Sequence, residues 1–340
     1  MKKISDFYKI LDPRYKNALV FLVVVLFLNS ILEMLLIAVL YPLISLLINP
    51  ETNFESKSVN EILSYLNSYT DNPNMIYNLL ILVILIFVFK FLFNVITLYF
   101  QNKYAFSLLQ NLSYKLFSSY ISKSYLDLSK ENSSYLIRNL TSNLNVFVNG
   151  VNAFINIISE LLIILSIAGL LLLIDFKIAI TVIIFFSMVS LTFLLLTKFR
   201  INKLSNQRFL LEGKKIKKIN EDLNGLIDIR LSGNISFFKN IYFKTENLLK
   251  ENYIKLQILL GLPKIWIEFI TICVFIIFTY FIINSTNTFL IDYIALIGLY
   301  ALSAFKMMPS FNRILINFIN VKFTKKIFLN ILNELKKLKY

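Results

Sequence analysis

The sequence has 340 residues, of which 57% are hydrophobic and 15% aromatic, and it carries a formal net charge of +15. A soluble domain of this length has no interior large enough for so much apolar surface, so the composition indicates a membrane protein. The single cysteine, Cys273, and the absence of histidine exclude an internal disulfide, a Cys-rich metal site and histidine-dependent catalysis. We therefore expect no metal site and no catalytic residue.

Long uncharged runs predict the transmembrane helices, since about twenty apolar residues cross a bilayer. Runs joined where one charge interrupts them give six spans, at residues 17–48, 76–102, 145–174, 177–197, 259–283 and 288–312. The first span is too long and too well flanked to be a cleaved signal peptide. The predicted fold class is thus an all-α polytopic membrane protein with six transmembrane helices.

The charges between the spans predict the orientation. Residues 1–16 hold five basic residues against two aspartates, and 49–75 hold four acids against one lysine. Residues 198–255 hold thirteen basic residues, so the positive-inside rule places both termini in the cytoplasm, as expected at the inner membrane. These basic residues would face anionic lipid headgroups, and we expect membrane lipid rather than nucleic acid as their partner.

The two inner connections, about 103–144 and 198–258, are long but poor in glycine and proline, which predicts helices that extend into the cytoplasm. Residues 198–222 would project roughly 37 Å. The spacing of Ile216, Ile219, Leu223 and Leu226 is typical of a coiled-coil seam. Polar stretches near 124–130 and 224–233 predict a short crosspiece at the tip of each extension.

Two surface helices are predicted besides the spans. Residues 58–69 would form an amphipathic helix on the outer side, lying on the leaflet or packed as an ordinary loop helix. Residues 1–13 would form an elbow helix on the inner surface, ending at Pro13. The transmembrane domain is then expected to cover 14–320.

Three stretches, SKENSSYLIRNLTSN, GLPKIWIEF and KMMPSFNRI, occur in order within this layout. With them, the sequence resembles the membrane domain of ABC exporters, in particular the branch that flips lipid-linked oligosaccharides. The resemblance implies a homodimer, an anionic sugar-diphosphate lipid as substrate, and coupling tips that dock on a partner ATP-binding subunit or domain holding ATP and Mg. The implied coupling residues are Tyr125, Leu126, Asp127, Leu128, Leu226, Ile227, Asp228, Ile229 and Arg230.

The sequence departs from that family because it lacks the G-x-x-x-x-G-K-[ST] phosphate loop. The LSGN stretch at 231–234 is interpreted as a turn rather than an ATPase signature. We therefore expect no enzyme activity and no cofactor in this chain, with 321–340 as a cytoplasmic tail leading towards an ATPase domain. That ATPase would be a separate subunit or the rest of a longer chain, unless the protein is a degenerate relative.

Ionisable residues within the spans are the candidate functional residues, because each charge costs about 2.5–3.5 kcal/mol at the bilayer centre. Lys306 and Arg313 share one helix face, and Pro309 between them predicts a kink. Lys264 can pair with Glu268 four residues on, and Glu33 can pair with Lys90. The whole set consists of Glu33, Lys90, Glu160, Lys264, Glu268, Lys306 and Arg313.

These four cations exceed the three glutamates by one, which favours an anionic ligand over complete internal matching. We expect Lys90, Lys264, Lys306 and Arg313 to line an inner cavity, with Glu33, Glu160 and Glu268 as charge partners. In the resembling branch, basic residues at the matching positions are thought to hold the diphosphate. Full pairing within the bundle, export of peptides or small hydrophobic molecules, and a non-transporting scaffold stay open as alternatives.

Overall fold

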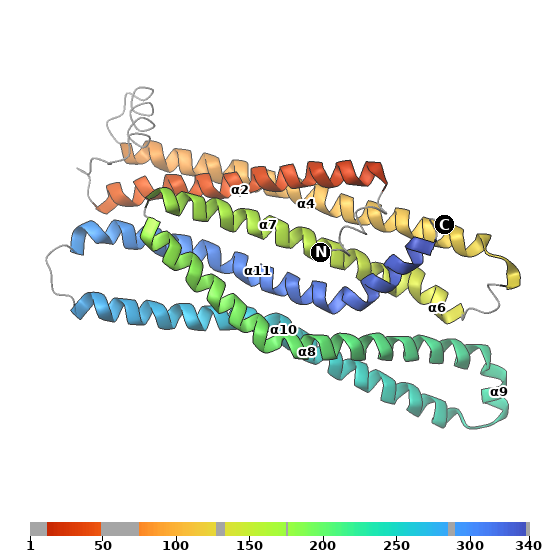
Figure 1. The fold of residues 1–340 in the computed structure, drawn as a ribbon. Helices are drawn as coiled ribbons and strands as arrows, with labels where there is room; N and C mark the ends of the chain where they lie inside the picture. The colour runs from red at the N-terminus through yellow and green to blue at the C-terminus, as the bar shows by residue number, and fades with distance from the viewer. Residues whose placement is uncertain (1–11, 49–74, 127–132, 175, 285–289, 338–340) are drawn as a thin grey trace.

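The computed structural model describes residues 12–48, 75–126, 133–174, 176–284 and 290–337, and in these ranges the chain is helical and has no strand. Figure 1 shows long helices running side by side along one axis. In chain order they are α2 (Pro13–Ile48), α4 (Met75–Ser122), α6 (Ser133–Arg138), the π-helix η1 (Asn139–Asn143), α7 (Leu144–Ile174), α8 (Phe176–Asn224), α9 (Leu226–Leu231), α10 (Ile235–Asn284) and α11 (Leu290–Lys337).

Five helices of the described part are long and apolar enough to cross a membrane: α2, α4, the continuous α6–α7 segment, α8 and α10. This confirms an all-helical chain of multi-pass membrane character. The side chains at 290–304, in the apolar part of α11, lie outside the described residues, so the sixth span stays a prediction. The predicted outer helix at 58–69 also lies outside them.

The helices are longer than a bilayer requires, as the two inner connections predict. Helix α8 has 49 residues and so measures about 74 Å, whereas a hydrocarbon core is about 30 Å thick. Its apolar first part is followed by a charged part, which returns after α9 as the first part of α10. Figure 1 shows α8 and α10 forming a hairpin with α9 at its tip.

The structure bears on two sequence expectations about helix ends and seams. Pro13 is the first residue of α2, because its fixed φ and missing N–H suit the first helical position, and the predicted elbow helix before it is not tested. The rest of the elbow, 1–11, lies outside the described residues. The coiled-coil seam is incomplete within one chain: Leu223 is 66% exposed and Leu226 is exposed too.

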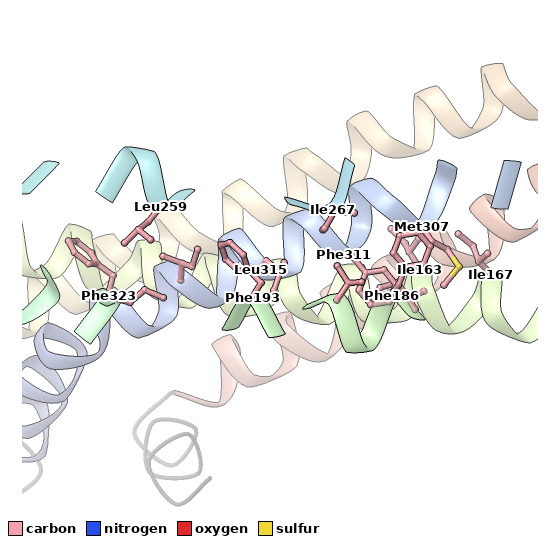
Figure 2. Packing of buried hydrophobic residues seen from close by; sticks show 14 of the residues in the cluster. Ile163, Ile167, Phe186, Phe193, Leu259, Ile267, Met307, Phe311, Leu315 and Phe323 are labelled. Carbon is pink, nitrogen blue, oxygen red and sulfur yellow. The ribbon is translucent and has the colours of Figure 1, made fainter. Parts of the chain in front are cut away.

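The buried side chains form two clusters, each held by aromatic packing. One joins α7, α8, α10 and α11 with Ile37 of α2, and there the rings of Phe186 and Phe311 stack with their centroids 5.3 Å apart. Figure 2 shows this cluster extending along the bundle from Phe323 to Ile167. The other cluster joins α2, α4, α7 and α11 around Phe147. Helices α7 and α11 each contribute several buried side chains to both clusters and so form the centre of the bundle.

The outer faces are apolar as well. Almost none of the most apolar stretch of α4 is buried within the chain. Exposed side chains such as Ile84, Phe91 and Leu98 follow this helix. In water such a surface would aggregate, so α4 faces lipid or another chain.

Candidate functional site

Glu33 and Lys90 form an ion pair between α2 and α4, as the sequence predicts. Both side chains are largely buried. Each is fifteen residues, or about 22 Å, from the end of its helix that lies beside the other's, Ile48 and Met75. A depth of that size lies within the hydrocarbon of a bilayer, where a lone charge would be costly. The pair therefore stabilises the α2–α4 contact.

Arg313 on α11 binds Glu160 on α7 through two hydrogen bonds. The Arg313 Nε donates to Glu160 Oε1, and Nη2 donates to Oε2 over 3.1 Å. Nη2 also lies 3.5 Å from the Ser310 hydroxyl. The sequence predicted that Glu160 pairs with a cation, but it did not predict that the cation is Arg313. The two residues are 153 positions apart, and no spacing rule connects them.

The two members of this pair differ in exposure. The Glu160 side chain is 11% exposed and the Arg313 side chain 51% exposed. The guanidinium thus has a buried carboxylate behind it and an open side in front. Its Nη1 takes part in none of these bonds, so donors remain available for an anion.

Lys264 and Glu268 pair along α10 at 3.8 Å, as their spacing predicts. Their side chains are 66% and 40% exposed, so this pair lies on the surface of the chain. Pro263 is inside α10, and the helix continues through it. Helix α11 likewise continues through Pro309, and the kink there stays a prediction.

The remaining predicted cavity residue, Lys306, is part of α11, but its side chain lies outside the described residues. The structure thus pairs Lys90, Lys264 and Arg313 with the three glutamates. It also describes a hollow of about 450 Å³ along one face of α4, and none of the four predicted cations lines it. The common cation-lined cavity stays a prediction.

Neutral polar contacts that the sequence did not indicate connect the same helices. The Gln101 amide donates to Asn156 Oδ1 between α4 and α7. Ser166 donates to the carbonyl oxygen of Ser30 over 2.9 Å, which joins α7 to α2. Isolated Ser, Asn and Gln residues in apolar runs indicate that such contacts exist. Their partners cannot be predicted from the sequence, because they depend on which face each helix turns towards its neighbours.

The predicted coupling residues lie at one end of the molecule, where the end of α4 and the short helix α9 are found (Figure 1). None of the α9 residues is buried, and Ile227 and Leu231 are among the most exposed apolar side chains. Gly233, with a φ of 64°, allows the chain to reverse after α9. Tyr125 and Leu126 are also exposed, whereas Asp127 and Leu128 lie outside the described residues.

Among the described residues, no group of three or more His, Cys, Asp or Glu side chains is placed to hold a metal ion. No protein-family model matches the sequence. The structure thus brings together two ion pairs between helices, a third pair on the surface of α10, and an exposed apolar tip.

Proposed function

We propose that this chain is the transmembrane subunit of an ATP-driven transporter that moves a phosphate-bearing, lipid-linked sugar or polysaccharide precursor across the inner membrane. The observation that carries the proposal is the state of Arg313, which is held by the buried Glu160 and is yet half exposed.

Arg313 shares the depth of its partner Glu160, which is fourteen residues, or about 21 Å, from the end of α7 at Ile174. A half-exposed guanidinium at that depth is unfavourable against lipid tails. A charge facing hydrocarbon costs about 2.5–3.5 kcal/mol, so the open side of Arg313 should face a polar pathway or a second chain. The planar fork of arginine suits phosphate oxygens, and its free Nη1 would supply that contact. Lys306, two turns earlier on α11, would add a second cation from the same face.

The exposed ion pair on α10 and the exposed apolar face of α4 favour a homodimer, because a second copy of the chain would cover them. The pathway would then lie between the two copies. The energy would come from a partner ATP-binding subunit or domain with its own ATP and Mg. The exposed apolar side chains of α9 favour such docking, since a solvated tip would be polar. Closure of the tips would move α8 and α10 as rigid levers.

The test is a flipping assay in proteoliposomes that contain the chain and its co-purified ATPase. The probe is a fluorescent lipid-linked sugar diphosphate. Arg313→Ala, Lys306→Ala and the double variant should reduce ATP-dependent flipping, whereas Lys255→Ala on the exposed cytoplasmic part of α10 should not. Wild-type rates in both single variants and the double would remove the phosphate-binding role.

A second candidate function is a non-transporting membrane scaffold. It is favoured by the pairing of Lys90, Lys264 and Arg313 with glutamates, since charges that neutralise one another need no ligand. Purification from native membranes separates the two candidates. A nucleotide-binding subunit should accompany a transporter at a fixed ratio and should be absent from a scaffold. If the chain transports peptide or small hydrophobic molecules instead, ATPase activity should respond to those and not to the diphosphate lipid.

A further inference from the structure

Three lysines on two packed helices lie near the level at which the apolar part of α8 ends. Lys198 is the first charge after the uncharged run 178–197, and twenty helical residues measure about 30 Å, the thickness of a hydrocarbon core. Lys322 and Lys325 come from α11. The position of Lys198 therefore places this group, the boundary lysines, at the edge of the bilayer.

The fold holds these like charges near one another. Burial lowers the pKa of Lys322, and the positive charges of Lys198 and Lys325 lower that pKa further. Two turns beyond Lys198, on the same face of α8, the buried Ser205 hydroxyl donates to the carbonyl oxygen of Phe323, the neighbour of Lys322, over 2.6 Å. This bond fixes α8 against α11 beside the lysines. The Lys322 ammonium also lies 4.5 Å from the centre of the Phe318 ring.

No acid neutralises the boundary lysines within the described part of the chain, where none of the three forms an ion pair. The deeper cations differ in this respect, since Lys90 and Arg313 each bind a glutamate. The acid Glu212, further along α8, already accepts hydrogen bonds from Arg208 and from the Tyr253 hydroxyl, so it is not a partner of these lysines. An external anion would relieve the repulsion.

The surface beside Lys198 indicates what kind of anion fits. Leu195, Leu196 and Phe199 are all strongly exposed there. A free inorganic anion would leave these side chains uncovered, whereas the acyl chains of a lipid would cover them. Ammonium groups at a membrane surface attract the phosphate of anionic lipids.

We propose that the boundary lysines Lys198, Lys322 and Lys325 form a binding site for the phosphate headgroup of an anionic phospholipid in the cytoplasmic leaflet. The lipid would bridge α8 and α11 beside the bilayer edge that Lys198 marks. This site does not depend on the proposed transport function, because it requires only a membrane.

Native mass spectrometry of the full chain tests the site, using micelles that contain equal amounts of phosphatidylglycerol and phosphatidylcholine. The test variant is Lys198→Gln/Lys322→Gln/Lys325→Gln. The control, Lys214→Gln/Lys239→Gln/Lys244→Gln, changes the net charge equally at cytoplasmic positions of α8 and α10. The wild type should retain phosphatidylglycerol preferentially. That preference should fall roughly tenfold in the test variant and less than twofold in the control.

A second triple variant with arginine at Lys198, Lys322 and Lys325 should retain the lipid, and it keeps the test informative if the glutamine variant does not fold. An unchanged preference in the glutamine variant would overturn the site, as would an equal loss in the control. An arginine variant that folds but loses the preference would also overturn it. Displacement by inorganic phosphate, but not by chloride at equal ionic strength, would show that the site takes a free anion instead of a lipid.

Discussion

The two members of the Glu160–Arg313 pair should contribute unequally to stability, because they differ in burial. Replacing Arg313 by methionine keeps the apolar stem and leaves an unpaired carboxylate that is 11% exposed. Orphaning a buried charge typically costs about 3–5 kcal/mol. Replacing Glu160 by glutamine leaves a cation that is 51% exposed and can still meet an amide oxygen, so about 1–2 kcal/mol is expected.

The assay is unfolding of the purified chain in micelles by a denaturing detergent. The single tryptophan, Trp266, reports on the fold, because its indole N–H donates to the carbonyl oxygen of Val189 between α10 and α8. Arg313→Met should lower the midpoint more than Glu160→Gln does. The control is Lys255→Met in the exposed α10 pair with Glu251, where less than about 0.5 kcal/mol is expected. Equal losses for both variants, or losses no larger than the control's, would refute the role of burial.

Two further predictions concern the long helical extensions. Gly213→Ala would place a Cβ against the guanidinium Nη1 of the buried Arg138. Because that guanidinium is also packed over the Phe209 ring and has little room to shift, the change should cost about 1–3 kcal/mol in the same unfolding assay. Gly169→Ala, whose Cβ meets nothing within 4 Å, should be neutral or stabilising, and equal losses at both positions would contradict the Arg138 contact. The Lys215 ammonium lowers the pKa of Glu246 by hydrogen bonding, so this pair stabilises the fold above the unfolded carboxyl's pKa and is lost as pH falls through the folded one. The thermal midpoint of the wild type should therefore fall more between pH 6 and pH 4 than that of Glu246→Gln, and parallel curves would contradict the assignment.

The helical fold and the long extensions could be predicted because they depend on local patterns. Uncharged runs, the scarcity of glycine and proline, and the polar stretch at 224–233 identify helices and breaks directly. Two ion pairs could be predicted from the same kind of local pattern. Lys264 and Glu268 are one helical turn apart, and Glu33 and Lys90 lie at matching depths of neighbouring spans.

The Glu160–Arg313 pair shows where this reasoning stops. Its geometry depends on which faces of α7 and α11 meet, and that is set by packing around residues such as Phe147 and Phe311. The excess of cations over acids in the spans indicated only that one cation would lack a partner. Of the boundary lysines, Lys198 was counted only among the basic residues of 198–255, and Lys322 and Lys325 belonged to the tail predicted at 321–340, because their approach to Lys198 depends on the α8–α11 contact.

Removing both members of the central pair separates its structural role from a role in transport. The double variant Glu160→Gln/Arg313→Met leaves no orphaned charge, so much of the stability lost in Arg313→Met should return, with a coupling of about 1–3 kcal/mol in the cycle. If the pair only holds α7 against α11, the double variant should also flip the diphosphate lipid at the wild-type rate. If the open side of Arg313 contacts the substrate, the same protein should fold and bind its ATPase but move little lipid. A stable and fully active double variant would leave the pair as packing alone and would require the phosphate contact to lie elsewhere in the chain.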